Sequence, residues 1–207
     1  MKITAKKMVT ILLTLAFFTS SYAQTMTKTQ DENATNSNGK LIKDLDGDGV
    51  LDSVYIEDSR IICRLSTQNF EKMQSQEVDI FDGSHIENAK NGFYFNINFM
   101  RGGHQNQFKY DNKTKRIQLI GMSRYQLGNA ANDGSGESSV NLLTNDYIGD
   151  WNYFDHNKTV LIKIPTIKTK MALGKVYLED FSEETYFGFA KKCEELYHTR
   201  KQREMQK

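Results

Sequence analysis

Residues 92–99, GFYFNINF, decide the fold class of this chain. The large apolar side chains fall on every second position, at Phe93, Phe95, Ile97 and Phe99. Successive side chains of a β-strand point to opposite faces of the sheet, so this spacing predicts a strand with one buried face. The polar residues between them, Asn96 and Asn98, are then expected on the opposite face.

The chain that follows repeats this pattern twice. The sequence RGGHQ at 101–105 predicts a turn, and QFKYD at 107–111 continues as a second strand. Another turn is expected at DNKTK, 111–115, before a third strand in RIQLIGMSRY, 116–125. Three apolar runs joined by short polar turns predict an antiparallel meander.

Further alternation of apolar residues indicates more strands, at Val54 and Ile56, at Ile61, Cys63 and Leu65, and at Val160, Ile162 and Ile164. Residues 128–139, GNAANDGSGESS, contain no large apolar side chain and predict a long flexible loop. The C-terminal segment has helical spacing, which predicts one helix from about Glu183 to about Lys201, capped by Asp180 or Ser182. The expected fold is mainly β, with antiparallel meanders and one C-terminal helix.

The N-terminus has the pattern of a secretory signal peptide. Three lysines precede an apolar run of 11 residues, 8–18, and small side chains follow at Ser21 and Ala23. This pattern predicts a signal peptide over residues 1–23. Because a membrane span needs about 20 apolar residues, we expect no span after cleavage. The mature protein is expected in the periplasm or outside the cell.

The rest of the chain is expected to contain one domain. Residues 24–39 are polar and poor in large apolar side chains, which predicts a disordered tether. Residues 40–207 are expected to form a single β-rich domain that includes the C-terminal helix. After cleavage, 24 of the 27 Lys and Arg residues remain against 26 Asp and Glu residues. Because this balance leaves no excess of positive charge, we expect no nucleic-acid partner.

A dense group of aspartates lies in residues 43–58, KDLDGDGVLDSVYIED, and predicts a metal site. Asp44, Asp46 and Asp48 follow the pattern D-x-D-x-D-G, in which carboxylates on alternate residues of a tight loop converge on one cation. Carboxylate oxygens are ligands that Ca²⁺ prefers. Such closely spaced negative charges also repel one another unless a cation neutralises them. The pattern therefore predicts a calcium loop.

The next residues complete the expected ligand set. Gly49 permits the sharp turn, and Val50 offers its main-chain carbonyl oxygen. Asp52, at the ninth position, is expected to coordinate the ion directly or through water. A helical calcium-binding hand would have a Glu at the twelfth position, where this chain has Tyr55. We therefore expect a calcium loop at the entry of a strand, a kind of loop that mostly stabilises a fold.

This loop, which runs directly into an apolar strand, resembles the calcium loops of FG-GAP and VCBS-type β-propeller repeats. The stretch FKYDNKTKRIQLIG, residues 108–121, is similar to a hairpin in a family of bacterial periplasmic proteins that pair the same loop with an incomplete propeller-like fold. The best understood members are immunity proteins that inhibit lysozyme-like peptidoglycan hydrolases. The resemblance implies an incomplete β-propeller and a protein that binds and inhibits such a hydrolase. No motif indicates which surface binds this partner.

No catalytic arrangement is visible in the sequence. The histidines share no metal-ligand spacing and lie in no acid–base motif, at His85, His104, His156 and His198. The Gly-Ser-Gly of residues 134–136 lacks the flanking pattern of a nucleophile elbow or of a phosphate-binding loop. We therefore expect a binding protein rather than an enzyme.

The aromatic residues favour an alternative partner class. They are numerous, and include Tyr94, Tyr125, Tyr147, Trp151, Tyr153 and Phe154. Exposed Tyr and Trp side chains anchor protein partners or stack on sugars, whereas buried ones fill the core. The alternative function is thus a calcium-braced carbohydrate- or protein-binding module of the cell envelope. Aromatics in a shallow groove would favour sugar, and a protruding aromatic or acidic loop would favour an enzyme cleft.

Two cysteines remain after cleavage, Cys63 and Cys193. Each lies on an apolar face, one of a predicted strand and one of the predicted helix. Export permits a disulfide between them if the helix packs on the sheet. Two buried free thiols agree equally well with the sequence.

Overall fold

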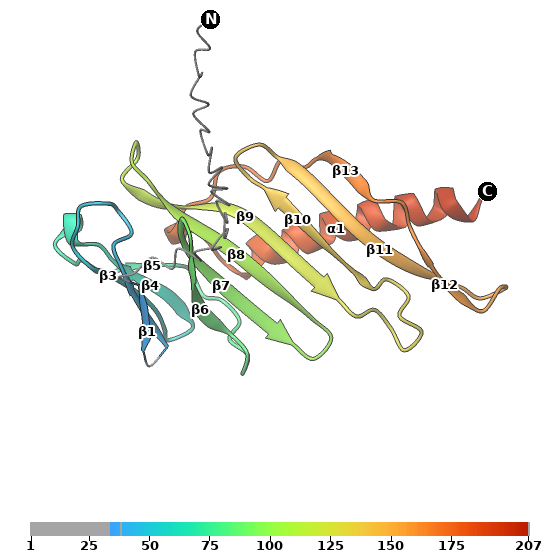
Figure 1. The fold of residues 1–207 in the computed structure, drawn as a ribbon, viewed down its shortest axis with the longest axis horizontal. Helices are drawn as coiled ribbons and strands as arrows, with labels where there is room; N and C mark the ends of the chain where they lie inside the picture. Colours follow the sequence, from blue (N-terminus) through green and yellow to red (C-terminus); the bar gives the residue numbers. More distant parts are fainter. Residues whose placement is uncertain (1–33, 38, 207) are drawn as a thin grey trace, which may run out of the picture.

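The protein is mainly β, with antiparallel sheets and one C-terminal helix, as predicted (Figure 1). The computed structural model describes residues 34–37 and 39–206. The predicted signal peptide, 1–23, and most of the predicted tether lie outside the described residues. The described strands form two sheets, in which every strand pairs antiparallel to its neighbour.

The first sheet is a five-stranded meander at one end of the molecule. Its strands follow the order of the sequence: β1 (Thr35–Ser37), β2 (Lys40–Lys43), β3 (Asp52–Glu57), β4 (Arg60–Arg64) and β5 (Met73–Gln74). A short 3₁₀ helix, η1 (Ser66–Gln68), follows β4. Lys43 joins this sheet to the next one, because its buried Nζ donates to Ala89 O at 2.7 Å.

The second sheet has eight strands and continues the meander. It contains β6 (His85–Ala89), β7 (Gly92–Phe99), β8 (Gly102–Asp111), β9 (Arg116–Gln126), β10 (Gly136–Asn141), β11 (Asp146–Asp155), β12 (Val160–Lys163) and β13 (Ile167–Lys170). Strands β6 to β12 pair in sequence order, and β13 also pairs with β11. The predicted meander of residues 92–125 is confirmed as β7, β8 and β9.

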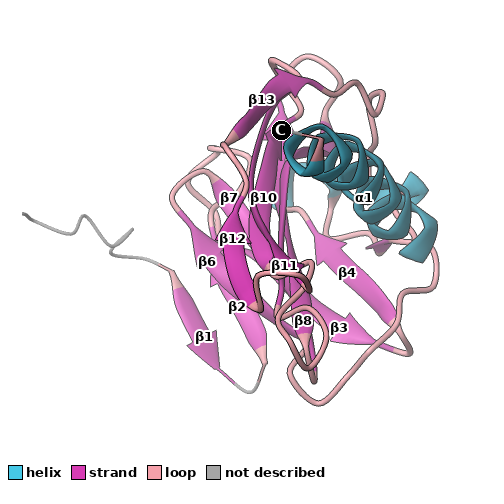
Figure 2. Cartoon of the chain, turned by 90° about the vertical axis from the view of Figure 1, so that its right-hand side faces the viewer, coloured by secondary structure: helices cyan, strands magenta, loops and turns pink. Residues whose placement is uncertain are grey.

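One helix, α1 (Glu183–Met205), packs against a single face of the second sheet (Figure 2). A second 3₁₀ helix, η2 (Leu178–Asp180), precedes it. The predicted start of the helix is confirmed: Ser182 is the N-cap, and its N–H is accepted by Thr185 Oγ1 at 3.2 Å. The opposite face of the sheet is not covered by α1 and is called the open face below.

The core lies between the covered face of the second sheet, α1 and the first sheet. Phe181 stands at its centre, where its ring meets Phe108 edge-on at 5.1 Å and Phe95 at 6.1 Å between centroids. Its carbonyl oxygen accepts the N–H of Gln76, which follows β5. A single cluster of buried apolar residues includes members of both sheets and of α1.

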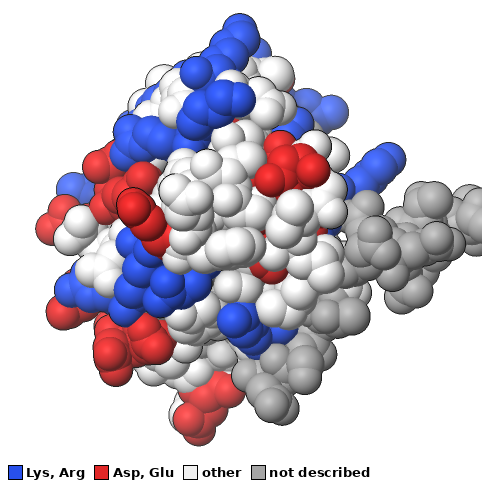
Figure 3. Space-filling view, turned by 90° about the vertical axis from the view of Figure 1, so that its left-hand side faces the viewer, with Lys and Arg blue, Asp and Glu red and all other residues white. Residues whose placement is uncertain are grey.

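The arrangement of the sheets differs from the incomplete propeller that the resemblance implies. Propellers place four-stranded blades around a central channel. The described strands form sheets of five and eight, because each strand from β6 to β12 pairs with the next instead of breaking into blades. Figure 3 views the end that carries the first sheet, where basic and acidic side chains gather in separate small groups.

The prediction of a long loop over residues 128–139 is wrong for its last four residues. Residues 136–139 belong to β10, which pairs with β9 on one side and with β11 on the other. The sequence does not indicate β10, because its outward side chains are polar and its main-chain hydrogen bonds come from the neighbouring strands. The remaining loop is also held in place: Asp133 accepts hydrogen bonds from Lys201 at 2.9 Å and from Tyr197 at 3.2 Å, both on α1.

Two boundaries also differ from the predictions. The turn expected at 101–105 is shorter, because β8 begins at Gly102. The tether expected over 24–39 extends too far, because residues 35–37 form β1 and pair with β2. An edge strand is held by main-chain hydrogen bonds, so it needs no apolar side chains.

The cysteines are free thiols, so the disulfide alternative is corrected. Cys63 lies on β4 in the first sheet, between Val54 and Met73 on the paired strands. Cys193 lies on α1 under the second sheet, where the hydroxyl of Ser138 on β10 is 3.4 Å from its sulfur. Each thiol is buried in a different part of the core, and burial raises the pKa of both.

The buried ring of His104 is expected to make the stability of the fold depend on pH. Its ring is buried against Phe99 and Tyr186, and burial, followed by the charge of Arg124, lowers its pKa from 6.5 to about 4. The unfolded chain therefore takes up a proton between these values that the folded chain excludes. Stability is expected to fall by about 3 kcal/mol as the pH drops through this window. Denaturant unfolding of wild type and His104→Gln across the window measures this effect.

The variant keeps a polar side chain but does not titrate. Its unfolding free energy is expected to change less between pH 6.5 and pH 4 than that of the wild type. Identical pH profiles for the two proteins would contradict the assignment to His104. Carboxylates with lowered pKa values, such as Asp133, are present in both proteins, so their contribution to the two pH profiles is expected to be the same.

Candidate functional site

The predicted metal loop, residues 44–52, connects β2 to β3 and is called the acidic loop. Ligand atoms of Asp44, Asp46 and Asp48 lie within 4.8 Å of one another. This cluster could hold a metal ion. The cluster is open to solvent: Asp48 is exposed, and Asp44 and Asp46 are partly exposed.

Hydrogen bonds inside the acidic loop orient the carboxylates. Asp44 accepts the N–H of Gly47 on Oδ1 at 2.7 Å and that of Gly49 on Oδ2 at 3.0 Å. Both glycines have positive φ, 84° and 86°, which other residues rarely adopt. The loop therefore bends around the carboxylate of Asp44 because glycines stand at these two positions.

The residues present fit a hard cation. All three side chains offer carboxylate oxygens, which suit Ca²⁺, Mg²⁺ or Mn²⁺ rather than metals that prefer nitrogen or sulfur. Thr67 donates to Asp46 Oδ2 at 2.5 Å, and Ser66 donates to Asp48 Oδ2 at 2.8 Å, so η1 steadies both side chains. The coordinating role of the Val50 carbonyl stays a prediction.

Asp52 has a different environment from the three clustered aspartates. Its side chain is 1% exposed, and its two oxygens accept the N–H groups of Leu45 at 2.7 Å and Ser66 at 2.8 Å. Burial raises its pKa, although these hydrogen bonds act in the opposite direction. Asp52 thus ties the start of the acidic loop to the start of η1. Its predicted role as a metal ligand stays a prediction.

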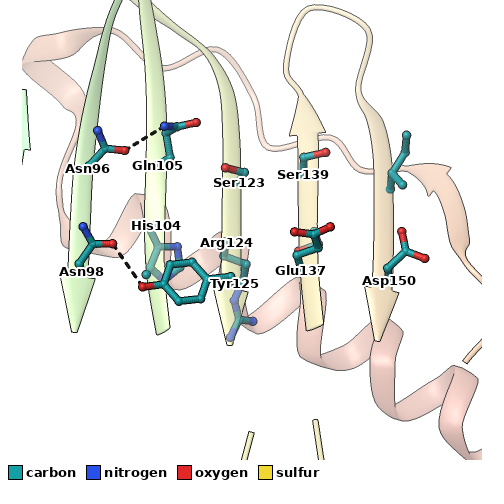
Figure 4. Close-up of a pocket in the computed structure, with 13 residues that line it drawn as sticks. Asn96, Asn98, His104, Gln105, Ser123, Arg124, Tyr125, Glu137, Ser139 and Asp150 are labelled. Carbon is teal, nitrogen blue, oxygen red and sulfur yellow. Dashed lines mark hydrogen bonds between the residues drawn. The ribbon is translucent and has the colours of Figure 1, made fainter. Parts of the chain in front are cut away.

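A second candidate site lies on the open face of the second sheet, where a groove crosses five strands. The strand registers align its side chains in two rows. The first row is Asn96, Gln105, Ser123, Ser139 and Ile148. The second row is Asn98, Gly103, Tyr125, Glu137 and Asp150. Figure 4 shows the two rows, with His104 and Arg124 on the opposite side of the sheet toward α1.

Tyr125 dominates this groove because of the glycine beside it. A Cβ at Gly103 would lie 2.7 Å from Tyr125 Cε1, so the Tyr125 ring rests directly on the backbone of β8. The Tyr125 hydroxyl is 3.4 Å from Asn98 Oδ1 on β7. The ring is 42% exposed, although Tyr147, Trp151 and Tyr153 are buried in the core. Glycine at this position therefore produces an aromatic platform across the groove.

The groove also contains two carboxylates. Asp150 accepts the hydroxyl of Thr166 at 2.7 Å, which lowers its pKa, and Lys163 lies 3.4 Å from the same oxygen. Asp150 is therefore ionised at neutral pH and unsuited to donate a proton as a general acid. The Glu137 carboxylate forms no hydrogen bond or ion pair with any described residue.

The turn between β7 and β8, residues 99–101, protrudes next to the groove and is called the hairpin tip. Met100 is 95% exposed, and the Phe99 ring is partly exposed beside Phe81. Arg101 fixes the tip, because its guanidinium donates to the carbonyls of Leu127, Gly128 and Asn129 at 2.8–3.3 Å.

The acidic loop lies near one end of β8, and the groove lies at the other end of that strand. The loop reaches the β8–β9 turn through η1, where Gln68 Nε2 donates to Lys115 O at 2.8 Å. The groove includes Gly103 at the start of β8, while that turn follows Asp111 at its end. The eight residues between them span roughly 26 Å in a strand. An ion in the acidic loop therefore cannot touch a ligand in the groove.

The groove was missed by sequence reasoning, although part of its signal was present. Asn96 and Asn98 were expected on the polar face of a strand, and Tyr125 was among the candidate aromatics. The sequence predicts a loop at Glu137 and Ser139, so it does not reveal that these residues lie beside Tyr125 and Ser123 in the groove.

Comparison of the chain with protein-family models, curated proteins and solved structures found no match. Among the described residues, no helix is both long and apolar enough to cross a membrane.

Replacing Asp52 with Ala tests its role in joining the acidic loop to η1. The change leaves two N–H groups, those of Leu45 and Ser66, without their acceptor. We expect a loss of about 3 kcal/mol in the free energy of unfolding, measured by urea denaturation in excess chelator. Asp52→Asn, which keeps one acceptor oxygen, should lose less. Wild-type stability of Asp52→Ala in chelator would contradict this role.

Proposed function

We propose that this chain is an exported calcium-binding protein that binds and inhibits a lysozyme-like peptidoglycan hydrolase, and that it is not itself an enzyme. The resemblance rests on the acidic loop and on residues 108–121. In this fold the loop leads directly into β3, and residues 108–121 form most of the β8–β9 hairpin. The helix η1 connects the two motifs, because Ser66 and Thr67 donate to the acidic loop and Gln68 donates to Lys115 O. A periplasmic or secreted location belongs to the same proposal.

The metal of the acidic loop is proposed to be Ca²⁺. Three carboxylates and a nearby main-chain carbonyl form the flexible, oxygen-rich set that calcium favours, whereas Mg²⁺ keeps most of its water ligands. When bound, the ion would offset two of the three negative charges of Asp44, Asp46 and Asp48. Since Thr67 and Ser66 hold two of these side chains, binding is expected to stabilise the first sheet and η1.

Calcium is expected to raise the melting temperature of the wild-type protein. At 100 times the dissociation constant, a bound ion adds about 2.7 kcal/mol to stability. The double variant Asp46→Ala with Asp48→Ala should lose this response and melt at the same temperature in calcium and in chelator. Thermal unfolding followed by circular dichroism measures both proteins.

Magnesium at equal concentration is the control for charge screening. A wild type whose melting temperature is unchanged by chelator would overturn the calcium proposal. Asp52→Ala separates the two roles of the loop, since its loss of stability is expected in chelator as well as in calcium.

The hairpin tip is the observation that favours inhibition. Met100 and Phe99 form an apolar tip where β7 and β8 meet, and Arg101 holds the tip with three hydrogen bonds. A protruding segment that is already ordered loses little conformational entropy when it enters a cleft. Interface energy also concentrates in a few such anchors. We therefore propose that the hairpin tip enters the substrate cleft of the hydrolase.

Met100→Asp tests this proposal, because it places a charge at the end of the hairpin tip. We expect wild type to suppress peptidoglycan lysis by its target at a one-to-one ratio, and the variant to inhibit roughly tenfold less or worse. The measurement is turbidity loss of peptidoglycan in calcium, with lysozyme-type enzymes encoded near this gene.

Leu143→Asp is the matched control, since Leu143 is a 62% exposed apolar residue in the β10–β11 turn. It should inhibit as wild type does. If wild type inhibits and both variants match it, the hairpin tip is not the contact surface. If wild type stops none of these enzymes, the inhibitor proposal fails as a whole.

The groove favours a second candidate, a calcium-braced carbohydrate- or protein-binding module. The specific observation is the aromatic platform of Tyr125 among polar side chains. This candidate needs no hydrolase, and its ligand would occupy the open face rather than meet the hairpin tip.

A further inference from the structure

Polar groups along the groove are left without partners by the protein itself. The hydroxyls of Ser123 and Ser139 and the carboxylate of Glu137 form no hydrogen bond with described residues. They come from two adjacent strands, Ser123 from β9 and both Ser139 and Glu137 from β10, so they lie close together in the middle of the groove (Figure 4). A ligand that lies there can satisfy all of them at once.

The neighbouring amides are already positioned. Asn96 Oδ1 accepts from Gln105 Nε2 at 3.0 Å, and Asn96 Nδ2 donates to Glu87 at 2.9 Å. Asn98 Nδ2 donates to the carbonyl of Gly83 at 3.2 Å. These bonds hold side chains of one wall in place before any ligand arrives, which reduces the entropy cost of binding.

The charge of the groove restricts its ligand. Of the described residues that line the groove, Glu137 and Asp150 carry the charges on the open face, and Lys163 at its rim lies 3.4 Å from Asp150 and compensates it. Arg124 is directed to the other side of the sheet, where it donates to Ala190 O of α1. The Glu137 carboxylate forms no ion pair with a described residue, so it repels an anionic ligand that lies beside it in the groove. The ligand that fits is therefore neutral or positively charged, and rich in donors.

Size and shape further define this ligand. The cavity has a volume of about 440 Å³. It crosses five strands, which corresponds to roughly 19 Å. The Tyr125 ring offers a flat apolar surface, whereas Ile148 is the single aliphatic side chain in the two rows. A protein partner would need larger apolar anchors, while an extended chain of hydroxyl-bearing rings needs one platform and many hydrogen bonds.

We propose that this groove binds an oligosaccharide of neutral or amino sugars. One sugar ring stacks on Tyr125, and its hydroxyl or amino groups donate to Glu137 and exchange hydrogen bonds with Ser123 and Ser139. This inference rests on the second candidate function and does not depend on inhibition of a hydrolase.

The test is calorimetric titration of the wild-type chain, in calcium, with four tetrasaccharides. These are chitotetraose, its deacetylated form, cellotetraose and, as the anionic control, tetragalacturonate. We expect binding of at least one of the first three and none of the fourth. Tyr125→Ala should weaken that binding roughly tenfold or more, which corresponds to about 1.4 kcal/mol. Glu137→Gln should weaken binding of the deacetylated, positively charged sugar more than binding of the neutral sugars.

Phe187→Ala is the matched control, because Phe187 is an exposed aromatic on α1, on the covered side of the sheet. It should bind as wild type does, and all variants should keep the wild-type melting temperature. Binding that Tyr125→Ala leaves unchanged would place the sugar elsewhere and overturn the groove as its site. No binding of any tetrasaccharide by the folded wild type would overturn the glycan proposal.

The hydrolase assay distinguishes failure of this inference from failure of the inhibitor proposal. If no sugar binds and Tyr125→Ala loses inhibition, the groove holds the protein partner and the glycan proposal is wrong. If sugar binds through Tyr125 and Met100→Asp alone loses inhibition, both proposals stand, each at its own surface.

Discussion

The packing of Phe181 is the interaction on which the rest of the structure depends. Its ring contacts Phe95 and Phe108 on the second sheet, and its carbonyl accepts a hydrogen bond from the segment after β5 in the first sheet. The same residue directly precedes Ser182, the N-cap of α1. Two sheets and a helix therefore meet at one buried aromatic side chain, and its position sets which face of the second sheet α1 covers.

Covering one face determines the chemistry of the other. Antiparallel sheets tolerate one solvated face, provided that side chains alternate between apolar and polar along each strand. In β7 to β11 this alternation places amides, hydroxyls and carboxylates on the open face, in rows dictated by strand register. Gly103 then gives this polar surface an aromatic platform, because it lets Tyr125 lie across the backbone. The groove is thus a consequence of the fold's asymmetry.

The structure separates stabilisation from recognition. The acidic loop, with Asp52 and η1 behind it, supports the first sheet and the β8–β9 turn, at one end of the long strands. The groove and the hairpin tip lie at the other end, where Arg101 and the positioned amides keep the surface ordered. A metal ion at the first end can raise stability without touching the surface proposed for binding, because roughly 26 Å of β8 lies between them.

The sequence by itself determined the β class, the meander of residues 92–125, the start of α1 and the acidic cluster. Each depends on residues close together in the chain, so alternation, capping and spacing are enough to predict it. Only the tertiary structure decided that Glu137 and Ser139 belong to a strand, that Cys63 and Cys193 stay apart, and which polar residues share the groove. These features depend on pairing between distant strands and on packing under α1. Local patterns contain no information about either, because hydrogen bonds and contacts from neighbours, rather than the residues' own preferences, hold them in place.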